Sequence, residues 1–536
     1  MKKTTRLVLA LLALFACFAM LSPVDVSVRA KNERTIPSNI RITPPAPTFD
    51  DKERIAELKQ RRERVAQSIG PQSFMILFST EPRVYTNDVD YPYRQENNLY
   101  YLTNLKQKNA TLVLLPGNTK VREILFMPRR NPAAETWTGH MYSPEEANQL
   151  SGIREIWQTS EFEPFIKALR NRQPYRPKPE NIFMSDLPAG MPLTNDNGYT
   201  TLFDAAAKGE AGLYMLVPGQ GESREYKQEQ KFAADWSSTA SGYSVKNAWP
   251  IFTQMRLVKS PMEVRLLQHA IDISTEAHQR AWAAAGEAKW EYEVDAVMAY
   301  TFKLRNADNW GYPDIVGCGP NATTLHYEES QGPVKQGELL LMDVGAEYDH
   351  YTADITRTFP VNGKFSPAQA AVYQIVYDAQ EAVAKATKPG ATLSDVNRAG
   401  TEVIKDGLLK LGLITDRNSM QHRVWFMHGT SHWLGMNVHD VGGGSKMAPG
   451  VVFTNEPGIY VRLDALDQMP FGWKADEWEQ FKTSVRPAFE KYKGIGVRIE
   501  DDMLVTDNGV RWLSEALPRK LSDVEDFISK ARRASE

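Results

Sequence analysis

A carboxylate set inside an apolar, β-rich run is the feature that most constrains this chain. The segment ELLLMDVGAEYDHYTADITRTF places Asp343 directly after four apolar residues, in a run typical of a buried central strand. An unpaired carboxylate is costly to bury there. A turn centred near Tyr348 and Asp349 would make the segment a hairpin and set Asp343 opposite Asp354, with Cβ atoms about 5 Å apart. Two carboxylates held that way repel each other, so we expect a positive group between them.

Plainer roles exist for each acid when it is taken alone. Either aspartate could cap a turn or pair with Arg357. Two further acids belong to β-rich runs, Glu456 in VVFTNEPGIYV and Glu500 in GIGVRIEDDMLVT. Glu456 alone could be a charge at a strand end, and Glu500 could share an acidic surface turn with Asp501 and Asp502. The argument for a common site therefore depends on their combination.

The segment MHGTSHWLGMNVHD supplies the missing donor, because it holds three of the nine histidines of the chain, His428, His432 and His439. Carboxylate oxygens with one imidazole suit Mn²⁺, Co²⁺ or Zn²⁺. Four carboxylates and a histidine can hold two divalent ions about 3.5 to 4 Å apart, which generate a hydroxide at neutral pH. The pattern indicates a hydrolytic metal centre. The sequence has no G-x-S-x-G or HExxH motif, and we expect Cys318 to be a small packed residue.

Residues 1–30 have the pattern of an export signal. Basic residues within the first six positions precede an apolar run over residues 7–21, and the stretch ends SVRA. The run is shorter than the roughly 20 residues of a membrane span. We therefore expect the signal sequence to be removed after about Ala30, which leaves a periplasmic or secreted protein with no stable membrane span. Cys318 is then the one cysteine left, so we expect no internal disulfide. LFAC also resembles a lipobox, so a lipoprotein anchored through Cys17 is the alternative.

The rest of the chain is expected to form a proline-rich lead over residues 31–50, a smaller α/β amino-terminal domain over 51–250 and an α+β catalytic domain over 251–536. A helix is predicted from Asp51, followed by the strands SFMILF, NLYYLTNL, ATLVLLP and REILFM and the helix FEPFIKALR. Pro261 begins a long amphipathic helix. The net charge of -3 gives no basic surplus, so no nucleic-acid partner is expected.

The motifs MDVG, ADITRTFPVNGKF, HGTSHWLGMNVHDVG, NEPGIYV and GIGVRIEDD resemble the signature segments of the aminopeptidase P and prolidase family. The resemblance extends over residues 255 to 515, and DYPYRQENNLYYLTNL with ATLVLLP is similar to the amino-terminal domain of that family. It implies a pita-bread catalytic domain with two divalent ions, usually Mn²⁺. It also implies a metal-dependent exopeptidase that releases the amino-terminal residue from peptides with proline second, by attack of a hydroxide that bridges the two metals.

The same resemblance implies roles for individual residues. His326 and His439 would hydrogen-bond the scissile carbonyl and the developing oxyanion, and Glu456 would accept the proton of the attacking water. Arg498 would orient carboxylates or bind substrate, and His428 is either a substrate contact or a structural histidine. Asp354 and Glu500 would bridge the two ions, and the implied metal ligands are Asp343, Asp354, His432, Glu456 and Glu500.

Some features depart from the family pattern. The loop DVGGGSKMAPGVVFTN lacks an arginine that many members carry, and Lys446 is its only basic residue, which weakens the alternative of an Xaa-Pro dipeptidase (prolidase). A creatinase-like hydrolase works without metal, and retention of all five ligands argues against it. An exported inactive binding protein would be expected to lack ligands. The long segment after NEPGIYV, residues 462–493, either rims the site or forms a solvated helix.

The family also implies a homo-oligomer, either a dimer or a tetramer. Tyr91, Tyr93, Tyr100 and Tyr101 in the amino-terminal domain are compatible with ordinary sheet packing. The alternative hypothesis is that one or more of them reach the active site of a neighbouring subunit.

Overall fold

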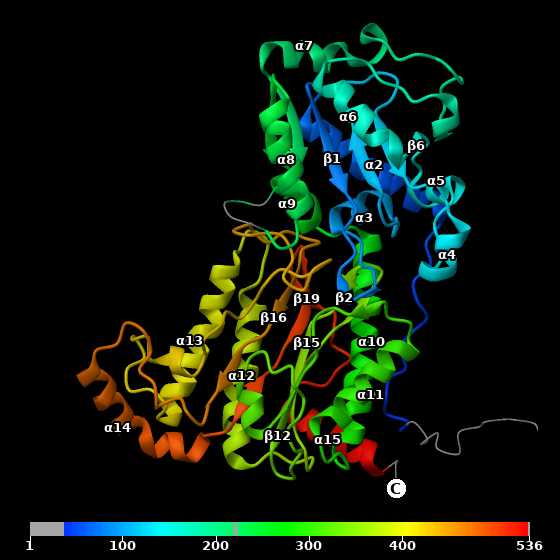
Figure 1. Cartoon of the computed structure of the whole chain (residues 1–536). Coiled ribbons are helices and arrows are strands. Elements are labelled where there is room, and N and C mark those ends of the chain that lie inside the picture. Colours follow the sequence, from blue (N-terminus) through cyan, green and yellow to red (C-terminus); the bar gives the residue numbers. More distant parts are fainter. Residues whose placement is uncertain (1–36, 218, 220–222, 534–536) are drawn as a thin grey trace, which may run out of the picture.

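The computed structural model describes residues 37–217, 219 and 223–533, and these form an upper unit around one large sheet and a lower unit of small sheets and long helices (Figure 1). The predicted signal sequence and Cys17 lie outside the described residues. Within the described ranges, no helix combines the length and apolar character needed to cross a membrane. The helix predicted from Asp51 is confirmed as α2 (Asp51–Ile69), and the side chain of Asp50 caps its first turn.

The upper, amino-terminal unit is organised around a mixed sheet of seven strands. The strand order is β7-β6-β5-β4-β1-β8-β9. The chain therefore builds the sheet outward from β1 to β7 on one side, and then adds β8 and β9 on the other side of β1. The strands β1 and β8 are parallel, whereas β1 and β4 are antiparallel. The bounds are β1 (Ser73–Phe78), β4 (Thr111–Leu114), β5 (Glu123–Met127), β6 (Ile156–Gln158), β7 (Ile182–Met184), β8 (Ala211–Met215) and β9 (Tyr243–Asn247).

Both faces of this sheet are covered, which explains why SFMILF is apolar throughout instead of alternating. Phe74 and Ile76 pack on one side with α6 (Phe162–Arg170), α7 (Thr200–Lys208) and α8 (Lys227–Thr239). Met75 and Leu77 pack on the other side with α2 and α5 (Pro144–Ser151). The second side is continuous with the core of the lower unit, so the two units share one hydrophobic cluster.

The prediction of a strand over NLYYLTNL is wrong, because this segment forms the helix α3 (Asn97–Thr103). A short apolar run does not by its period distinguish a strand from a buried helix. The side chain of Glu96 caps the helix by accepting from the Leu99 amide, and all residues of α3 are buried between the units. Tyr100 and Tyr101 are accordingly 5% and 2% exposed within their own chain, whereas Tyr91 is 53% exposed.

The lower unit begins with the helix predicted at Pro261, which is confirmed as α10 (Pro261–Ala285). The side chains of Ser260 and Glu263 cap its amino-terminal end reciprocally. This helix and three more long helices surround the small sheets (Figure 1). Their bounds are α11 (Glu291–Leu304), α12 (Pro367–Ala386) and α13 (Leu393–Leu411).

The predicted hairpin around Asp343 is present, but its register differs from the expected one. Asp343 lies opposite Thr356 and not opposite Asp354. The turn residues are Asp349 and His350, both with positive φ, so the turn centre lies one residue later than predicted. This shift moves the pairing by two positions, which keeps both carboxylates on the same face. The strands involved are β12 (Leu339–Val344), β13 (Ala346–Tyr348), β14 (Tyr351–Thr352) and β15 (Ile355–Pro360).

The second strand system of the lower unit consists of two ladders that follow each other. The strand β16 (Val452–Asn455) pairs with β19 (Asp501–Thr506), and β17 (Gly458–Tyr460) pairs with β18 (Gly496–Arg498). Asn455 lies opposite Asp501 in the first ladder, and Gly458 lies opposite Arg498 in the second. The same register carried through the gap places Glu456 opposite Glu500.

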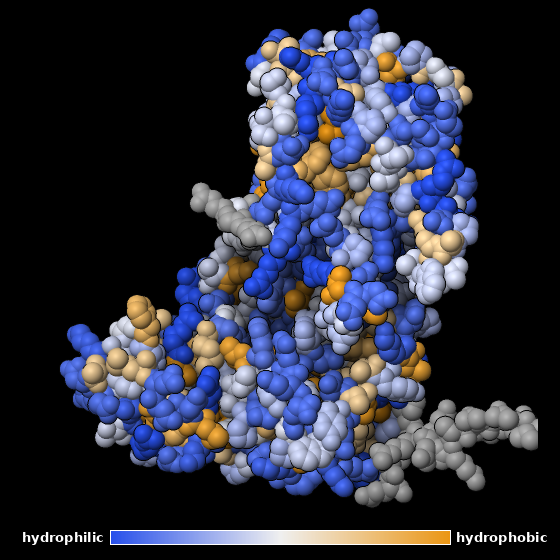
Figure 2. Space-filling view, viewed as in Figure 1, coloured by the Kyte–Doolittle hydropathy of each residue, from blue (hydrophilic) through white to orange (hydrophobic). Residues whose placement is uncertain are grey.

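The long segment after β17 forms an arm that carries α14 (Ala475–Tyr492). Figure 2 shows this arm at the lower left, where orange apolar patches interrupt a mainly hydrophilic surface. Its helix buries Trp478, Phe481, Val485 and Phe489 against the molecule. The arm contributes no residue to the cavity that holds the predicted site, so it does not rim that site. The alternative of a solvated helix describes α14 better, because most of its residues are exposed and one apolar face is buried.

Candidate metal centre

The side chains singled out from the sequence line one cavity of about 400 Å³ in the lower unit. They come from separate places in the chain, namely the strand ends described above, the loop after β11 (Ile315–Cys318) and the segment between α13 and β16. The tertiary structure therefore brings together His326, Asp343, Asp354, His428, His432, His439, Glu456, Arg498 and Glu500.

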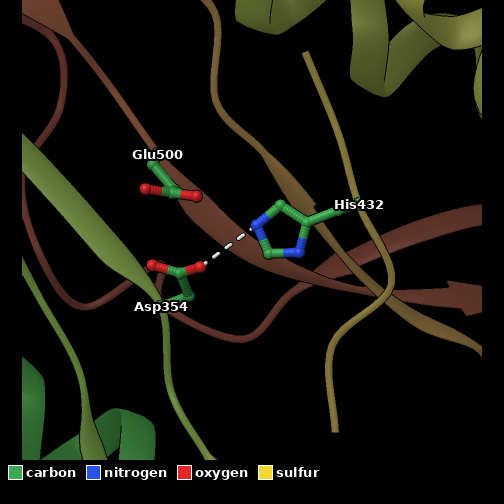
Figure 3. A group of neighbouring side chains, drawn as sticks. All are labelled: Asp354, His432 and Glu500. Carbon is green, nitrogen blue, oxygen red and sulfur yellow. Dashed lines mark ion pairs between the residues drawn. The ribbon is translucent and has the colours of Figure 1, made fainter. Parts of the chain in front are cut away.

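Three of these side chains are close enough to share an ion. Candidate ligand atoms of Asp354, His432 and Glu500 all lie within 4.8 Å of one another (Figure 3). The Nε2 atom of His432 is 3.2 Å from Asp354 Oδ2 and 3.5 Å from Glu456 Oε1. Its Nδ1 atom is 3.1 Å from the carbonyl oxygen of Trp433. An Nδ1 proton donated to that carbonyl leaves the Nε2 lone pair free for a metal.

The electrostatics of the cavity show an excess of negative charge. Burial raises the pKa of Asp354, and the charge of Asp343 adds to the effect. Burial also raises the pKa of Glu456 to about 7, and burial with the charges of Asp354 and Glu456 raises the pKa of Glu500 well above its usual value. For His432, burial lowers the pKa, but the Asp354 hydrogen bond and the Glu456 charge outweigh it and raise the pKa to about 9. Each shift is the response of a site that favours added positive charge.

Tyr312 gives the clearest sign that a cation belongs here. Its hydroxyl lies 2.6 Å from Asp343 Oδ1 and 2.6 Å from Asp354 Oδ1. A phenol has one proton, so it donates to only one of these oxygens and the other lacks a donor. When the four carboxylates, the Arg498 guanidinium and the His432 imidazole are all charged, two negative charges stay uncompensated. This donor set fits divalent cations.

Arg498 is buried and orients its neighbours. Its guanidinium donates to Asp343 Oδ2, to the Thr356 hydroxyl at 3.0 Å and to the Tyr460 hydroxyl at 2.9 Å. The Thr356 hydroxyl in turn donates to Glu500 Oε2 at 2.6 Å. Of the two alternatives for Arg498, this geometry favours orientation of carboxylates over direct binding of substrate.

The three histidines of the segment 428–439 differ in their surroundings. His428 has Nδ1 2.6 Å from the Gly429 carbonyl and Nε2 2.8 Å from the Tyr460 hydroxyl, so both ring nitrogens are already engaged. Burial and the charge of Arg498 lower its pKa to about 3. The His439 ring stands edge-on to the His432 ring at 4.5 Å. Burial and the charge of His432 lower the pKa of His439, which keeps it a neutral imidazole.

Sequence reasoning missed three polar residues of this site, Tyr312, Thr356 and Tyr460. With the turn at Asp349 and His350, the register itself would have set Thr356 opposite Asp343. Tyr312 lies in a turn-rich segment before β11, and no pattern in that segment marks it.

The plainer alternatives for the acids have different outcomes. Asp343 is salt-bridged, although its partner is Arg498, and Glu456 directly follows the end of β16. Arg357 pairs with Asp501 at 2.7 Å and not with Asp343 or Asp354. Glu500, Asp501 and Asp502 are all buried, which excludes a surface turn. Cys318 is a packed thiol, as predicted, and burial raises its pKa to about 12.

Comparisons with known proteins agree with this geometry. Residues 265–507 match the model of metallopeptidase family M24, and residues 58–176 match the aminopeptidase P amino-terminal domain. The Xaa-Pro aminopeptidase of Haemophilus influenzae is 33% identical over 484 residues, which cover 88% of this chain and 97% of that protein. The chain belongs to the aminopeptidase P family.

Solved structures of aminopeptidase P share the fold. Escherichia coli aminopeptidase P with the inhibitor Pro-Leu superimposes with a TM-score of 0.71 at 29% identity, covering 91% of this chain and 100% of that one. Proline aminopeptidase P II from Yersinia pestis superimposes with a TM-score of 0.70 at 30% identity, covering 89% of this chain and 99% of that one. The predicted α+β pita-bread domain with a preceding α/β domain is confirmed. Membership in aminopeptidase P makes the chain a metal-dependent aminopeptidase and does not favour the prolidase alternative.

Proposed function

We propose that this protein releases the amino-terminal residue from peptides that carry proline in the second position, with two Mn²⁺ ions as the working metals. One observation carries the proposal: four carboxylates and His432 line the same cavity. In the strand ladders, Glu456 lies opposite Glu500 and Asp343 lies diagonal to Asp354. Like charges opposed across strands are destabilising unless a cation compensates them. The names of the relatives, Xaa-Pro aminopeptidases, support the choice of substrate.

The substrate class also has a physical rationale. An Xaa-Pro bond is a tertiary amide without an N–H, so it cannot make the backbone hydrogen bond on which general peptidases depend. A cavity that instead grips the carbonyl oxygen and the free amino terminus can accept it. Asp343, Asp354, His432, Glu456 and Glu500 are the residues that would hold the ions. Two bound divalent ions supply Lewis acidity and an attacking hydroxide at neutral pH.

The remaining chemistry is assigned to side chains of the cavity. Glu456, with 18% of its side chain exposed and its pKa raised to about 7, takes the proton of the attacking water and returns it to the departing proline nitrogen. His439, a neutral imidazole, and His326 donate to the carbonyl oxygen as negative charge develops on it. Arg498 fixes Asp343, and His428 borders the bound substrate from its anchored position.

We also propose that the protein is exported and acts in the periplasm or outside the cell. The basic start, the apolar run over residues 7–21 and the SVRA end support this. Cell fractionation with a Cys17→Ser variant tests it. Loss of membrane association in that variant would indicate a lipoprotein, whereas an unchanged soluble extracytoplasmic fraction would support cleavage after Ala30.

A homo-oligomer is the third part of the proposal. The hairpin of β2 (Val84–Thr86) and β3 (Val89–Asp90) is exposed, and the rings of Tyr85 and Tyr91 pack edge to face on its surface with 64% and 53% exposure. Apolar side chains of this size on an exposed hairpin suit burial against a second copy. Light scattering on the purified protein measures the mass, and a monomer at micromolar concentration would contradict this part.

The activity is tested with three peptides in one mass-spectrometric time course. The Mn²⁺-loaded protein receives Xaa-Pro-Yaa, Xaa-Ala-Yaa and the dipeptide Xaa-Pro, and a parallel sample contains a chelator. We expect loss of Xaa-Pro-Yaa alone, abolished by the chelator and restored best by Mn²⁺ in a series with Co²⁺, Zn²⁺ and Mg²⁺. Cleavage of the dipeptide alone would indicate a prolidase, and cleavage of no peptide would indicate an inactive protein.

A further inference from the structure

The residues 433–440, named the histidine loop here, follow His432 and carry His439, and they form neither a helix nor a strand. The lower unit fixes the start of the histidine loop. The Leu434 amide donates to the Val452 carbonyl at 3.1 Å, and the Gly435 carbonyl accepts from the Thr352 amide at 3.0 Å. The position of His439 therefore depends on what holds the apex and the far end.

The far end of the histidine loop is held by a buried ionic cluster. Asp440 accepts hydrogen bonds from Arg256 and, at 3.3 Å, from Lys259, and the three side chains are each 1% exposed. Arg256 lies on the connecting helix α9 (Trp249–Leu257). The packing is tight, because a Cβ atom on Gly435 would approach Asp440 Oδ2 to 2.2 Å.

The apex of the histidine loop is held by the amino-terminal unit. The Met436 carbonyl accepts from Arg94 at 2.8 Å, and the side-chain oxygen of Asn437 accepts from the Asn97 amide group at 2.8 Å. In the part of the chain that the structure describes, Met436 and Asn437 accept hydrogen bonds from only two residues outside the loop, Arg94 and Asn97. Packing of the buried Met436 side chain adds to them.

Arg94 and Asn97 are themselves fixed on the hairpin of the lower unit. Asn97 is 8% exposed, accepts from Arg94 at 2.9 Å and lies 3.3 Å from His350 Nδ1. Arg94 also donates to Glu347 at 2.8 Å. The adjacent Asn98 accepts from Arg256 at 2.8 Å. The start of α3 thus reaches both the apex of the histidine loop and the cluster at its far end.

We propose that Asn97 and Arg94 are positioning residues for His439, so that the amino-terminal unit sets the geometry of a catalytic group in the lower unit. The inference rests on the proposed function, in which His439 contacts the scissile carbonyl. Release of the apex frees the peptide that precedes His439, while the carboxylates and His432 keep their strand-based supports. A misplacement of about 1 Å at a catalytic group can lower a rate about a hundredfold.

The test compares Asn97→Ala and Arg94→Ala with Arg54→Ala. Arg54 is a matched control, because it also joins the amino-terminal unit to the hairpin, through Asp349 at 2.6 Å, but makes no contact with the histidine loop among its described hydrogen bonds. We expect Asn97→Ala and Arg94→Ala to lower kcat about ten- to thirtyfold, with KM and metal content nearly unchanged. Arg54→Ala should stay within about threefold of the wild type.

A double-mutant cycle separates positioning from general destabilisation. In a His439→Ala background, Asn97→Ala should cost less than about threefold in kcat, because the group it positions is gone. An equal loss in both backgrounds would overturn the inference.

Hydrogen exchange gives a readout that does not depend on activity. Amides of residues 434–440 should exchange at least about tenfold faster in Asn97→Ala than in Arg54→Ala. Equal exchange would refute the positioning role even if the enzyme is active. Failure of the wild type to cleave Xaa-Pro-Yaa would instead refute the proposed function, and the exchange result would still decide whether Asn97 holds the loop.

Discussion

The cavity holds its carboxylates and its histidines in two different ways. Asp343, Asp354, Glu456 and Glu500 lie in or between hydrogen-bonded strands, whose register fixes their positions. His428, His432 and His439 lie on an irregular segment, and the amino-terminal unit holds the apex between His432 and His439. The difference indicates that the sheets place the carboxylates locally, whereas the placement of His439 depends on how the two units are assembled.

The largest effect should come from breaking the strand-based side. Asp354→Asn removes a charge from the ligand group, and we expect kcat/KM to fall more than about a thousandfold, because metal stabilisation of the transition state is worth several kcal/mol. Metal content measured on the purified variant should fall as well. Asp349→Asn changes an aspartate of the same hairpin that pairs with Arg54 and should keep nearly full activity. A tenth of normal activity in Asp354→Asn would contradict the assignment.

The next effect distinguishes the two histidines whose rings stand 4.5 Å apart. His439→Ala should lower kcat about a hundred- to a thousandfold by removing a donor to the oxyanion, while bound metal stays unchanged. His432→Ala should lose both activity and metal. Steady-state kinetics with elemental analysis measure both quantities. Metal loss in His439→Ala would show that the histidine loop also builds the metal centre and would weaken the comparison.

A smaller effect is expected at Tyr312, which the sequence did not mark. Tyr312→Phe removes the hydroxyl that touches Asp343 and Asp354, so we expect metal affinity to fall about ten- to a hundredfold. Activity measured against metal concentration gives the shift. Tyr351→Phe is the matched control, since its hydroxyl donates to Glu263 at 2.9 Å outside the cavity. Equal shifts in both variants would mean that Tyr312 supports the fold alone.

The smallest effect concerns pH and the support of the strand that follows Asp354. His278 on α10 is buried, and its Nε2 lies 3.0 Å from the Ile355 carbonyl. Burial and the charge of Arg357 lower its pKa to about 3. The unfolded chain binds the proton near pH 6.5, so this contribution to stability is complete above that pH and is lost as the pH falls towards 3.

Between pH 7 and pH 5, His278 should therefore lower the free energy of unfolding by about 2 kcal/mol. Denaturant titrations at the two pH values measure the change. In His278→Gln, the free energy of unfolding should change less between the two pH values, by that amount. Both proteins carry the same metal ligands, so any release of metal contributes equally to the two titrations. The same pH dependence in both proteins would show that His278 is protonated in the folded state.

Much of the site was predictable from local sequence. The acids stand out because they interrupt apolar β-rich runs, and His432 stands out because its segment holds so many of the few histidines. The helix at Pro261 followed from its amphipathic pattern and from the proline at its first position. The register at Asp343 was not predictable, because a turn one residue later shifts the pairing by two positions. The helix α3 was mistaken for a strand because a run buried on all sides has no period.

The sequence by itself determined the donor set, the family and the starts of α2 and α10, since these depend on residue types and spacings within short segments. Only the tertiary structure decided that Glu456 faces Glu500 across two ladders and that Tyr312 joins two aspartates. It also decided that Asn97 holds Asn437, a residue 340 positions away. Such contacts arise from register and from the docking of one unit on another, which hydrophobic burial of α3 stabilises and which no local pattern encodes.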